Sequence, residues 1–525
     1  MEVNPILLQV FKNLFASVAE EMGVTLNRTA FSANIKERRD YSCAVFTGNG
    51  QLVAQAAHIP VHLGSMPMSV KTALERFDFQ AGDMVILNDP FQGGTHLPDI
   101  TIVAPVFAGE EKPVFYVANR AHHADIGGMS AGSMPLATTI YQEGLIIPPL
   151  KIMQQGEPDR QLIQLILSNV RTPDEREGDL AAQLMANTTG IRRLQELTGK
   201  YGSSVCEYYA ARLMDYSEAI TRAAISALPD GSYEFSDFLD GDGVGTDDIP
   251  IRLTVKVSGD SIGFDFRKSG DQVKGSVNAV YAITVSTVLY VMRCLVARDI
   301  PMNAGILRPV EVITRPGSVL DARFPAAVAG GNVETSQRIV DVILGALARA
   351  LPGKIPAASQ GTMNNVTLGG FDHEQGRAFA YYETIAGGCG ASAQNIGAGA
   401  VHSHMTNTLN TPVEALEYSY PLLVTKYAVR RGSGGQGANR GGDGIIREIK
   451  MLAETELNIL SERRKYRPYG LEGGEAGQAG RNIIIKNGQQ QFRPGKFSEL
   501  LQKGDILKIE TPGGGGYGSV SQNEL

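Results

Sequence analysis

The sequence contains no tryptophan and few cysteines, which narrows the kinds of site that it can carry. Only four cysteines occur among 525 residues, and no two of them form a CxxC pair. A thiolate zinc site and a disulfide framework are therefore not expected. Sparse, widely separated cysteines suit a reducing compartment, so we expect a cytoplasmic location. The cysteines are Cys43, Cys206, Cys294 and Cys389.

Long hydrophobic runs are missing as well. The longest, from Ala279 to Met292, ends before Arg293 and is too short to cross a bilayer, so it predicts a buried helix. The first residues, MEVNPILLQVFKNLF, lack the basic region and the small-residue cleavage site of a secretory signal. We therefore expect neither secretion nor a membrane partner.

Basic tracts are absent, and the formal net charge is -7, so a nucleic-acid partner is not expected. The P-loop pattern GxxxxGK[ST] does not occur, so any main ATP site is expected to lie elsewhere. The stretch GSGGQG, Gly432–Gly437, matches GxGxxG by letter, but ANRGGDG follows it instead of a helix. Without a βαβ unit we reject dinucleotide binding and expect these glycines to permit tight turns.

A serine nucleophile is also excluded. The stretch GMSAG, Gly128–Gly132, matches GxSxG, but no strand runs directly into it and Pro135 obstructs the helix that must follow. The strand–turn–helix context that exposes such a serine is therefore missing, and Ser130 is not expected to act as a nucleophile.

What the sequence does contain is a mixture of helical and strand patterns, with 60 glycines concentrated in its second half. Period-3.6 and alternating patterns predict an α+β fold, with mixed sheets and helical insertions in one large intertwined chain. We expect helices over 5–34, 66–77, 157–227, 277–298 and 336–351, a hairpin of strands over 41–47 and 51–57, strands over 82–90, 100–108 and 113–120, and β structure over 231–268 and in the tail.

Domain boundaries are weakly marked, because neither an internal repeat nor a low-complexity linker occurs. At roughly 150 residues per domain, about three parts are expected. We divide the chain into an N-terminal α+β region over 1–155, a helical region with a β insertion over 156–300, and a glycine-rich α+β region over 301–525.

Polar residues gather at one end of the predicted strands. If strands 82–90, 100–108 and 113–120 form an antiparallel meander, the loop with His96 and Asp99 lies at the end to which the third strand returns. That strand delivers His122 and His123, with Asp125 just beyond. We expect these side chains to share one rim of the sheet.

The hairpin over 41–57 supports the same convergence. Asp40 enters the hairpin and His58 leaves it at the same open end, with His62 close behind. Imidazole and carboxylate ligands suit Zn, Mn or Fe(II), and an open coordination position permits catalysis. A His-x-x-Asp pair can instead be an Asx turn with a neighbouring histidine, and spacing alone leaves both interpretations open.

Two further stretches carry polar groups beside glycines. Residues 381–392 contain Glu383 and Cys389, and residues 397–417 contain His402 and His404. These loops are either hydrogen-bonded segments packed on the core or a wall that contacts substrate or another subunit. Cys389 is a weak candidate nucleophile, because no basic partner can be named for it.

Seven motifs in order give the chain a strong resemblance to the hydantoinase B family. They are RRDYSCAVF, AHIPVHLGSMP, LNDPFQGGTHLPDI, AHHADIGG, GNVETSQRI, HMTNTLNTPVEALE and RRGSGGQGANRGGDG. The family includes the matching region of ATP-dependent 5-oxoprolinase, lactamase subunits and, more distantly, acetone carboxylase-type subunits. The resemblance covers essentially the whole chain.

The resemblance implies a B-type subunit of an ATP-dependent hydrolase that cleaves C–N bonds in cyclic amides such as hydantoin, N-methylhydantoin, 5-oxoproline or a lactam. A hydantoinase A-type partner would bind ATP and Mg and phosphorylate the carbonyl oxygen, in a hetero-oligomer with more than one copy. This chain would hydrolyse the activated intermediate with a metal-bound water. The alternatives are a carboxylase subunit that joins bicarbonate to a ketone, and a non-catalytic assembly scaffold.

The resemblance also implies residue roles. Its metal site maps onto Asp40, His96, Asp99 and His122, where His122 rests on aligning the pattern AH--D-GG with AHHADIGG. The adjacent His123 is the competing choice for the fourth ligand. His123 or His62 is expected to move protons during the reaction.

Overall fold

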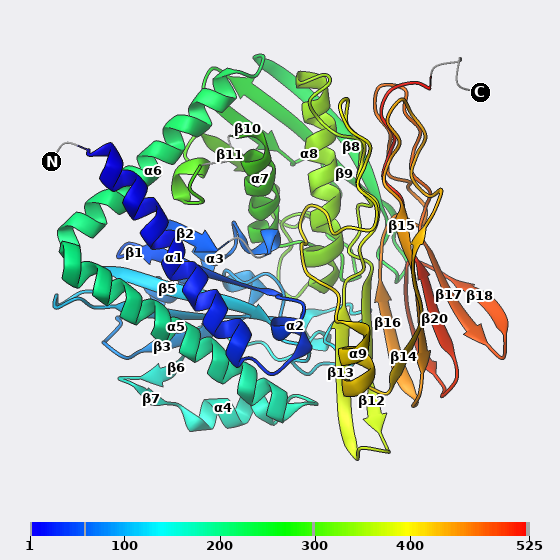
Figure 1. The fold of residues 1–525 in the computed structure, drawn as a ribbon, viewed down its shortest axis with the longest axis horizontal. Coiled ribbons are helices and arrows are strands. Elements are labelled where there is room, and N and C mark those ends of the chain that lie inside the picture. The colour runs from blue at the N-terminus through cyan, green and yellow to red at the C-terminus, as the bar shows by residue number, and fades with distance from the viewer. Residues whose placement is uncertain (1–2, 57–58, 297–299, 521–525) are drawn as a thin grey trace.

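The computed structural model describes residues 3–56, 59–296 and 300–520. The chain is an α+β protein in which a helix-covered N-terminal sheet lies beside two stacked C-terminal sheets (Figure 1). One cluster of buried hydrophobic residues contains side chains from Phe11 to Leu460, so much of the chain shares a single core. Among the described residues, none of the helices is long and apolar enough to cross a membrane.

The N-terminal sheet contains the predicted hairpin and the predicted meander. Its strand order is β2-β1-β5-β4-β3-β6-β7, and every neighbouring pair is antiparallel. Helices α1 (Pro5–Thr29) and α5 (Pro173–Tyr201) cover one face, and α3 (Met66–Arg76) packs on the other. The strands are β1 (Tyr41–Thr47), β2 (Leu52–Ala56), β3 (Met84–Leu87), β4 (Asp99–Val106), β5 (Phe115–His122), β6 (Leu150–Gln154) and β7 (Glu157–Pro158).

The first helix ends earlier than its hydrophobic period predicts. Helix α1 (Pro5–Thr29) begins with Pro5 in its first turn and with the Asn4 side chain accepting from the Ile6 and Leu7 amides. After it, the backbone amides of Phe31 and Ser32 donate to Asp179 of α5 at 2.9 and 3.0 Å. This long-range carboxylate holds the chain extended between α1 and the short helix α2 (Ala33–Lys36), so the expectation of one helix over 5–34 was wrong.

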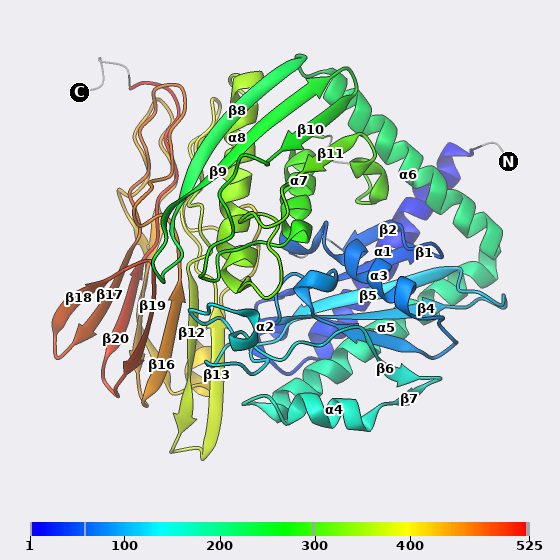
Figure 2. The same ribbon diagram turned by 180° about the vertical axis from the view of Figure 1, so that it is seen from behind.

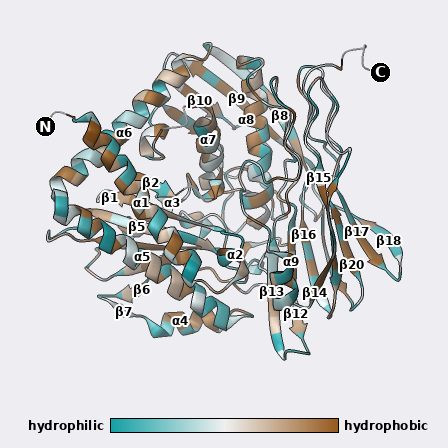
Figure 3. Cartoon of the chain, viewed as in Figure 1, coloured by the Kyte–Doolittle hydropathy of each residue, from teal (hydrophilic) through white to brown (hydrophobic). Residues whose placement is uncertain are grey.

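Helices that follow β7 along the chain lead from the first sheet to a second one (Figure 2). They are α4 (Arg160–Leu167), α5 (Pro173–Tyr201) and α6 (Ser203–Ser226), whereas α3 (Met66–Arg76) lies between β2 and β3 of the first sheet. Figure 3 shows hydrophobic and hydrophilic residues interspersed along α1 and α5, as expected for helices with one face on a sheet. The second sheet has the order β11-β10-β9-β8, and its strands are β8 (Gly231–Gly241), β9 (Asp247–Ser258), β10 (Ser261–Asp265) and β11 (Val310–Ile313).

Two buried helices fill the space between the sheets. Helix α7 (Tyr281–Leu295) is buried over most of its length, as the longest apolar run predicts. Helix α8 (Ser336–Ala350) follows a π-helical turn over Gly331–Thr335. Such wide turns are rare and often occur at functional sites. Four short 3-10 turns lie at Pro60–His62, Pro90–Gln92, Ile140–Gln142 and Ala304–Leu307.

The C-terminal sheets stack around a second hydrophobic core. Their strand orders are β13-β12-β16-β19 and β14-β15-β20-β17-β18. The elements are β12 (Asn365–Asp372), β13 (Arg377–Glu383), α9 (Val413–Ser419), β14 (Leu422–Arg430), β15 (Gly444–Met451), β16 (Thr455–Leu460), β17 (Arg481–Lys486), β18 (Gln489–Arg493), β19 (Lys496–Leu501) and β20 (Ile506–Glu510).

The glycine-rich segments of this half pack side by side with little room for side chains. Gly435 donates to Gly514, and Gly514 donates to Gly442, each at 2.9 Å. A Cβ atom at Gly514 would lie 2.0 Å from the carbonyl oxygen of Cys389. Within GSGGQG only Gly432 has a positive φ. The other glycines of this stretch are therefore explained by close packing of neighbouring segments and not by the tight turns that the sequence predicted.

Candidate metal centre

The end of the N-terminal sheet brings together the residues that the strand pattern predicted. Asp99 is the first residue of β4, His122 is the last of β5, and the two are paired in the antiparallel ladder. Asp40 immediately precedes β1, and its carbonyl accepts the amide of His122 at 3.0 Å. His96 lies in the turn before β4, where the amide of Asp99 donates to its carbonyl at 3.1 Å. The predicted meander and its shared rim are present.

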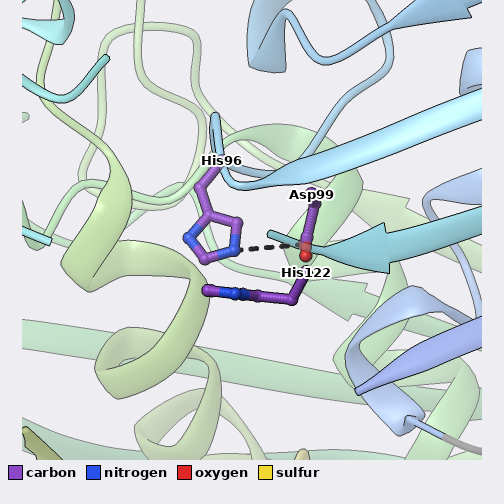
Figure 4. Close-up of side chains that lie close together, drawn as sticks. All are labelled: His96, Asp99 and His122. Atoms are coloured by element: carbon purple, nitrogen blue, oxygen red, sulfur yellow. Dashed lines mark ion pairs between the residues drawn. The ribbon is translucent and has the colours of Figure 1, made fainter. Parts of the chain in front are cut away.

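His96 and His122 lie close to the Asp99 carboxylate (Figure 4), whereas Asp40 is not part of this group of three. The Nε2 atom of His96 lies 3.2 Å from Oδ2 of Asp99, and ligand atoms of His96, Asp99 and His122 lie within 4.8 Å of one another. His62 joins them from the Pro60–His62 turn, with its Nε2 3.4 Å from the same oxygen. All four side chains are buried, and Asp40 is 7% exposed. His58 lies outside the described residues.

The cluster has ligand atoms without partners, which is the strongest sign that it fits a cation. Among the described residues, Nδ1 of His96, Nε2 of His122 and Oδ1 of Asp99 make no hydrogen bond or ion pair, and the Nε2 atoms of His62 and His96 have only their contacts with Oδ2 of Asp99. Buried polar atoms are nearly always paired, because an unpaired one loses its interaction with water. Imidazole nitrogens and a carboxylate form a donor set for Zn, Mn or Fe(II).

Other side chains fix the orientation of the candidate ligands. The amide nitrogen of Asn34 lies 3.1 Å from Nδ1 of His122, so Nε2 is the nitrogen left for the cluster. The hydroxyl of Ser42 lies 3.0 Å from Nδ1 of His62, and the hydroxyl of Thr95 donates to Oδ2 of Asp99 at 2.6 Å. Partners of this kind set the ring orientation of ligating histidines.

The local electrostatics favour the protonation states that metal ligands need. Burial lowers the pKa of His122 well below its usual range, and the neighbouring His96 adds to the effect. Burial opposes ionisation of Asp99, but the nearby His96 and His62 hold its pKa well below the ordinary value. A neutral imidazole and an ionised carboxylate result. Burial raises the pKa of Asp40 despite the opposing charge of Arg38.

The structure separates the two adjacent histidines. The Nε2 atom of His123 lies 2.9 Å from the side-chain oxygen of Gln183 on α5, away from Asp99. Burial, with the charge of Arg176, lowers the pKa of His123 to about 4. Successive residues at a strand end point to opposite faces, so only one of the pair can enter the cluster. His122 does so, and His123 lies among residues of α5.

A small cavity adjoins the cluster. Its volume is about 20 Å³, which is room for one ion or water molecule. Most of its wall comes from stretches that the sequence analysis singled out, which are the motifs AHIPVHLGSMP, GNVETSQRI and HMTNTLNTPVEALE and residues 381–392, whereas Met363 lies outside them. Besides Asp40, His62, Asp99 and His122, the wall contains Ile59, Val61, Asn332, Val333, Met363, Tyr382, Thr384, Met405, Thr406 and Thr408.

Both polar loops combine hydrogen-bonded packing with a share of the cavity wall, which includes Tyr382 and Thr384 from the first loop. Glu383 forms a buried ion pair with Arg447 at 2.7 and 3.1 Å and accepts from Asn410, which is the hydrogen-bonded packing that one interpretation predicted. Met405 and Thr406, from the second loop, line the cavity and form part of its wall. Burial raises the pKa of the Cys389 thiol, which disfavours the thiolate.

The fold and this cluster define an α+β protein with a buried candidate centre for a divalent metal. The Hydantoinase B/oxoprolinase family model matches residues 4–520. The chain therefore belongs to the hydantoinase B/oxoprolinase family, as its motifs predicted.

Relatives place the chain within that family. It is 42% identical over 528 residues to the 5-oxoprolinase of Dictyostelium discoideum, covering 98% of this chain and 40% of that protein. It is 41% identical over 530 residues to Uncharacterized protein MJ0963 of Methanocaldococcus jannaschii, covering 100% of this chain and 92% of that protein. The ATP-dependent caprolactamase from Pseudomonas jessenii matches with a TM-score of 0.93 and 28% identity, over 99% of this chain and 92% of that chain.

Proposed function

We propose that this chain is the hydrolytic component of an ATP-dependent cyclic amide hydrolase. The substrate would be 5-oxoproline, hydantoin, N-methylhydantoin or a lactam. The observation that carries the proposal is the buried cluster of His96, Asp99 and His122, with its unpartnered ligand atoms. Its setting in a chain similar to a 5-oxoprolinase and to a caprolactamase adds further support.

Asp40, His96, Asp99 and His122 would hold the metal ion, which we propose to be Zn, Mn or Fe. Such an ion, when bound, polarises a carbonyl or phosphoryl oxygen and lowers the pKa of a water molecule. The protein's own part is to present imidazole nitrogens and a carboxylate from buried side chains. The small cavity and the burial of these side chains support that part, because electrostatic interactions strengthen where little water is present.

His62 is the group placed to move protons. Its Nε2 atom faces Asp99 at the cavity, and Ser42 holds the other ring nitrogen. We propose that Nε2 accepts a proton from the attacking water and returns it to the leaving amine. We assign this role to His62 and withdraw it from His123, since His123 contacts Gln183 on α5.

A second component of the hydantoinase A type would bind ATP and Mg and phosphorylate the amide oxygen. Amides resist hydrolysis because nitrogen donates into the carbonyl, and phosphorylation of the oxygen removes that resistance. Addition of water to the carbon and cleavage of the ring C–N bond then open the ring, and hydrolysis releases phosphate. The chain spans about two fifths of the 5-oxoprolinase that it matches, at 40%, which leaves room in that longer protein for an ATP-using part.

The test is co-expression of this chain with a hydantoinase A-type partner in a heteromeric complex. We expect ATP-dependent ring opening of at least one of 5-oxoproline, hydantoin, N-methylhydantoin and caprolactam, and its loss in His96→Ala. Bicarbonate-dependent consumption of a ketone, without turnover of any of the four amides, would identify a carboxylase instead. A complex without activity and without stoichiometric metal would identify an assembly scaffold.

A further inference from the structure

Tyr382 brings the C-terminal half of the chain against the candidate metal centre. It lies in β13, whereas His122 ends β5 of a different sheet. The two rings stack with centroids 4.6 Å apart and planes 9° from parallel. Tyr382 is 1% exposed and lines the same cavity as Asp99. The face of one candidate ligand is therefore covered by an aromatic ring from a distant part of the sequence.

The position of Tyr382 is itself fixed by hydrogen bonds. Its hydroxyl donates to Oδ1 of Asn365 at 2.8 Å, and the amide of Asn365 donates to Glu334 at 2.6 Å. Glu334 belongs to the π-helical turn over Gly331–Thr335, which also supplies Asn332 to the cavity wall. These hydrogen bonds thus connect the Tyr382 ring, through Asn365, to the π-helical turn that forms another part of the cavity wall.

Arg38 closes a ring of contacts around His122. Its guanidinium carbon lies 4.7 Å from the centroid of Tyr382, and Nη1 donates to the Tyr382 carbonyl at 3.0 Å. The same nitrogen donates to Oδ1 of Asn34 at 3.3 Å, and the amide of Asn34 contacts Nδ1 of His122. Tyr382 therefore contacts the ring face of His122 and Asn34 contacts its Nδ1, and Arg38 donates hydrogen bonds to both of these residues.

We propose that Tyr382 is a positioning residue for the metal centre. Its ring fixes the plane of the His122 imidazole, so that Nε2 is directed toward Asp99 and His96 before an ion arrives. Preorganisation of this kind removes an ordering cost from binding. The inference rests on the metal site of the proposed function and adds to it a contribution from the C-terminal half.

Metal affinity tests the proposal without any need for catalysis. We would measure Zn and Co(II) dissociation constants by chelator competition for the wild type, Tyr382→Phe, Tyr382→Leu and the control Tyr381→Leu. Tyr381 is equally buried, at 1%, but its hydroxyl donates to Glu383 and its ring packs on Tyr420. Both leucine variants lose a buried aromatic ring, so their unfolding midpoints indicate the general cost of that loss.

Tyr382→Leu should bind metal about 10–100-fold more weakly, the range typical of lost orienting contacts. It should also change the Co(II) absorption spectrum. Tyr382→Phe keeps the stacked ring but loses its hydrogen bond to Asn365, so its affinity should lie between those of the wild type and Tyr382→Leu. Tyr381→Leu should keep wild-type affinity. If Tyr382→Leu does not fold, Tyr382→Met replaces it, because methionine fills irregular space.

Two results would overturn the proposal in distinguishable ways. In the first, the wild type binds metal tightly, and Tyr381→Leu and the variant without a ring at 382 have the same affinity as each other. This result would keep the metal site and refute positioning by Tyr382. A wild-type chain that binds none of Zn, Co(II), Mn or Fe would refute the metal site and the positioning role together.

Discussion

Asp99 and His122 face each other across neighbouring antiparallel strands, as the first residue of β4 and the last residue of β5. The ladder therefore fixes their spacing before any ligand is present. A slip of one residue in this register would turn His122 away and bring His123 toward Asp99. The buried faces of both strands prevent such a slip, because every side chain of β4 and β5 would change sides.

The two adjacent histidines should differ in metal binding. His122→Ala removes a nitrogen directed at the cluster, so the purified chain should lose most of its metal. His123→Gln should keep wild-type metal content, because His123 contacts Gln183 and takes no part in the cluster. Elemental analysis of both variants checks this, and metal loss confined to His123→Gln would reverse the assignment.

Glu143 should make stability depend on pH. Its carboxylate accepts the amides of Val328 and Ala329 at 2.8 and 2.9 Å, and burial raises its pKa to about 8 from the ordinary 4.5. Between those values the folded state keeps a proton that the unfolded state has lost, so this contribution to stability falls as pH rises, and above about pH 8 it no longer changes.

The variant Glu143→Gln removes this titration. Its thermal midpoint should therefore fall less than that of the wild type between about pH 5 and 8. The exposed Glu110→Gln serves as the control and should follow the wild type. Parallel midpoint curves for Glu143→Gln and the wild type would refute a raised pKa at Glu143.

The buried pair of Glu383 and Arg447 should be a structural requirement. Both side chains are 0% exposed, and the pair is bidentate at 2.7 and 3.1 Å. Glu383→Ala leaves a buried guanidinium without its charge partner and should reduce the free energy of unfolding by about 3–5 kcal/mol. The control Glu75→Ala breaks an exposed pair with Lys71 and should change it by less than about 1 kcal/mol. Urea unfolding compares the two, and equal losses would contradict this account.

Close packing of the glycine segments predicts a position-specific effect of alanine. Gly514→Ala would place Cβ 2.0 Å from the Cys389 carbonyl oxygen, so the neighbouring segments must move apart. The thermal midpoint should therefore fall. Gly199, within α5, meets no atom within 4 Å in the described part of the chain. Gly199→Ala should stabilise the protein by roughly 0.5–1 kcal/mol, because alanine favours a helix interior. Similar midpoints for the two variants would show that the segments are loosely packed.

Much of the metal centre could be predicted from sequence because its parts are local. Short runs of apolar and β-branched residues, bounded by turn residues, predicted the strands, and if they form an antiparallel meander every second loop lies at one end. His96, Asp99 and His122 lie at or near strand termini, so their convergence in the candidate metal centre required only the correct topology. Which of two adjacent histidines enters the cluster depends on strand register, which the spacing of polar residues could not decide.

The remaining features depend on contacts between distant segments. Tyr382 stacks on a residue from another sheet, and no local periodicity marks it as a neighbour of His122. The break after α1 depends on Asp179 of α5, which takes up the amides of Phe31 and Ser32. The close packing of the glycine segments involves stretches of this chain that are far apart in sequence, so the sequence alone did not predict it. The proposed three-part division of the chain stays a prediction.

Metal content under matched conditions tests the central claim most directly. We would purify the wild type and His96→Ala without chelators, supply Zn, Mn and Fe(II), and measure bound metal per chain after gel filtration. The account predicts a stoichiometric divalent ion in the wild type and its loss in His96→Ala at an unchanged unfolding profile. A wild-type chain that retains no ion, or a His96→Ala chain that retains a full one, would contradict it.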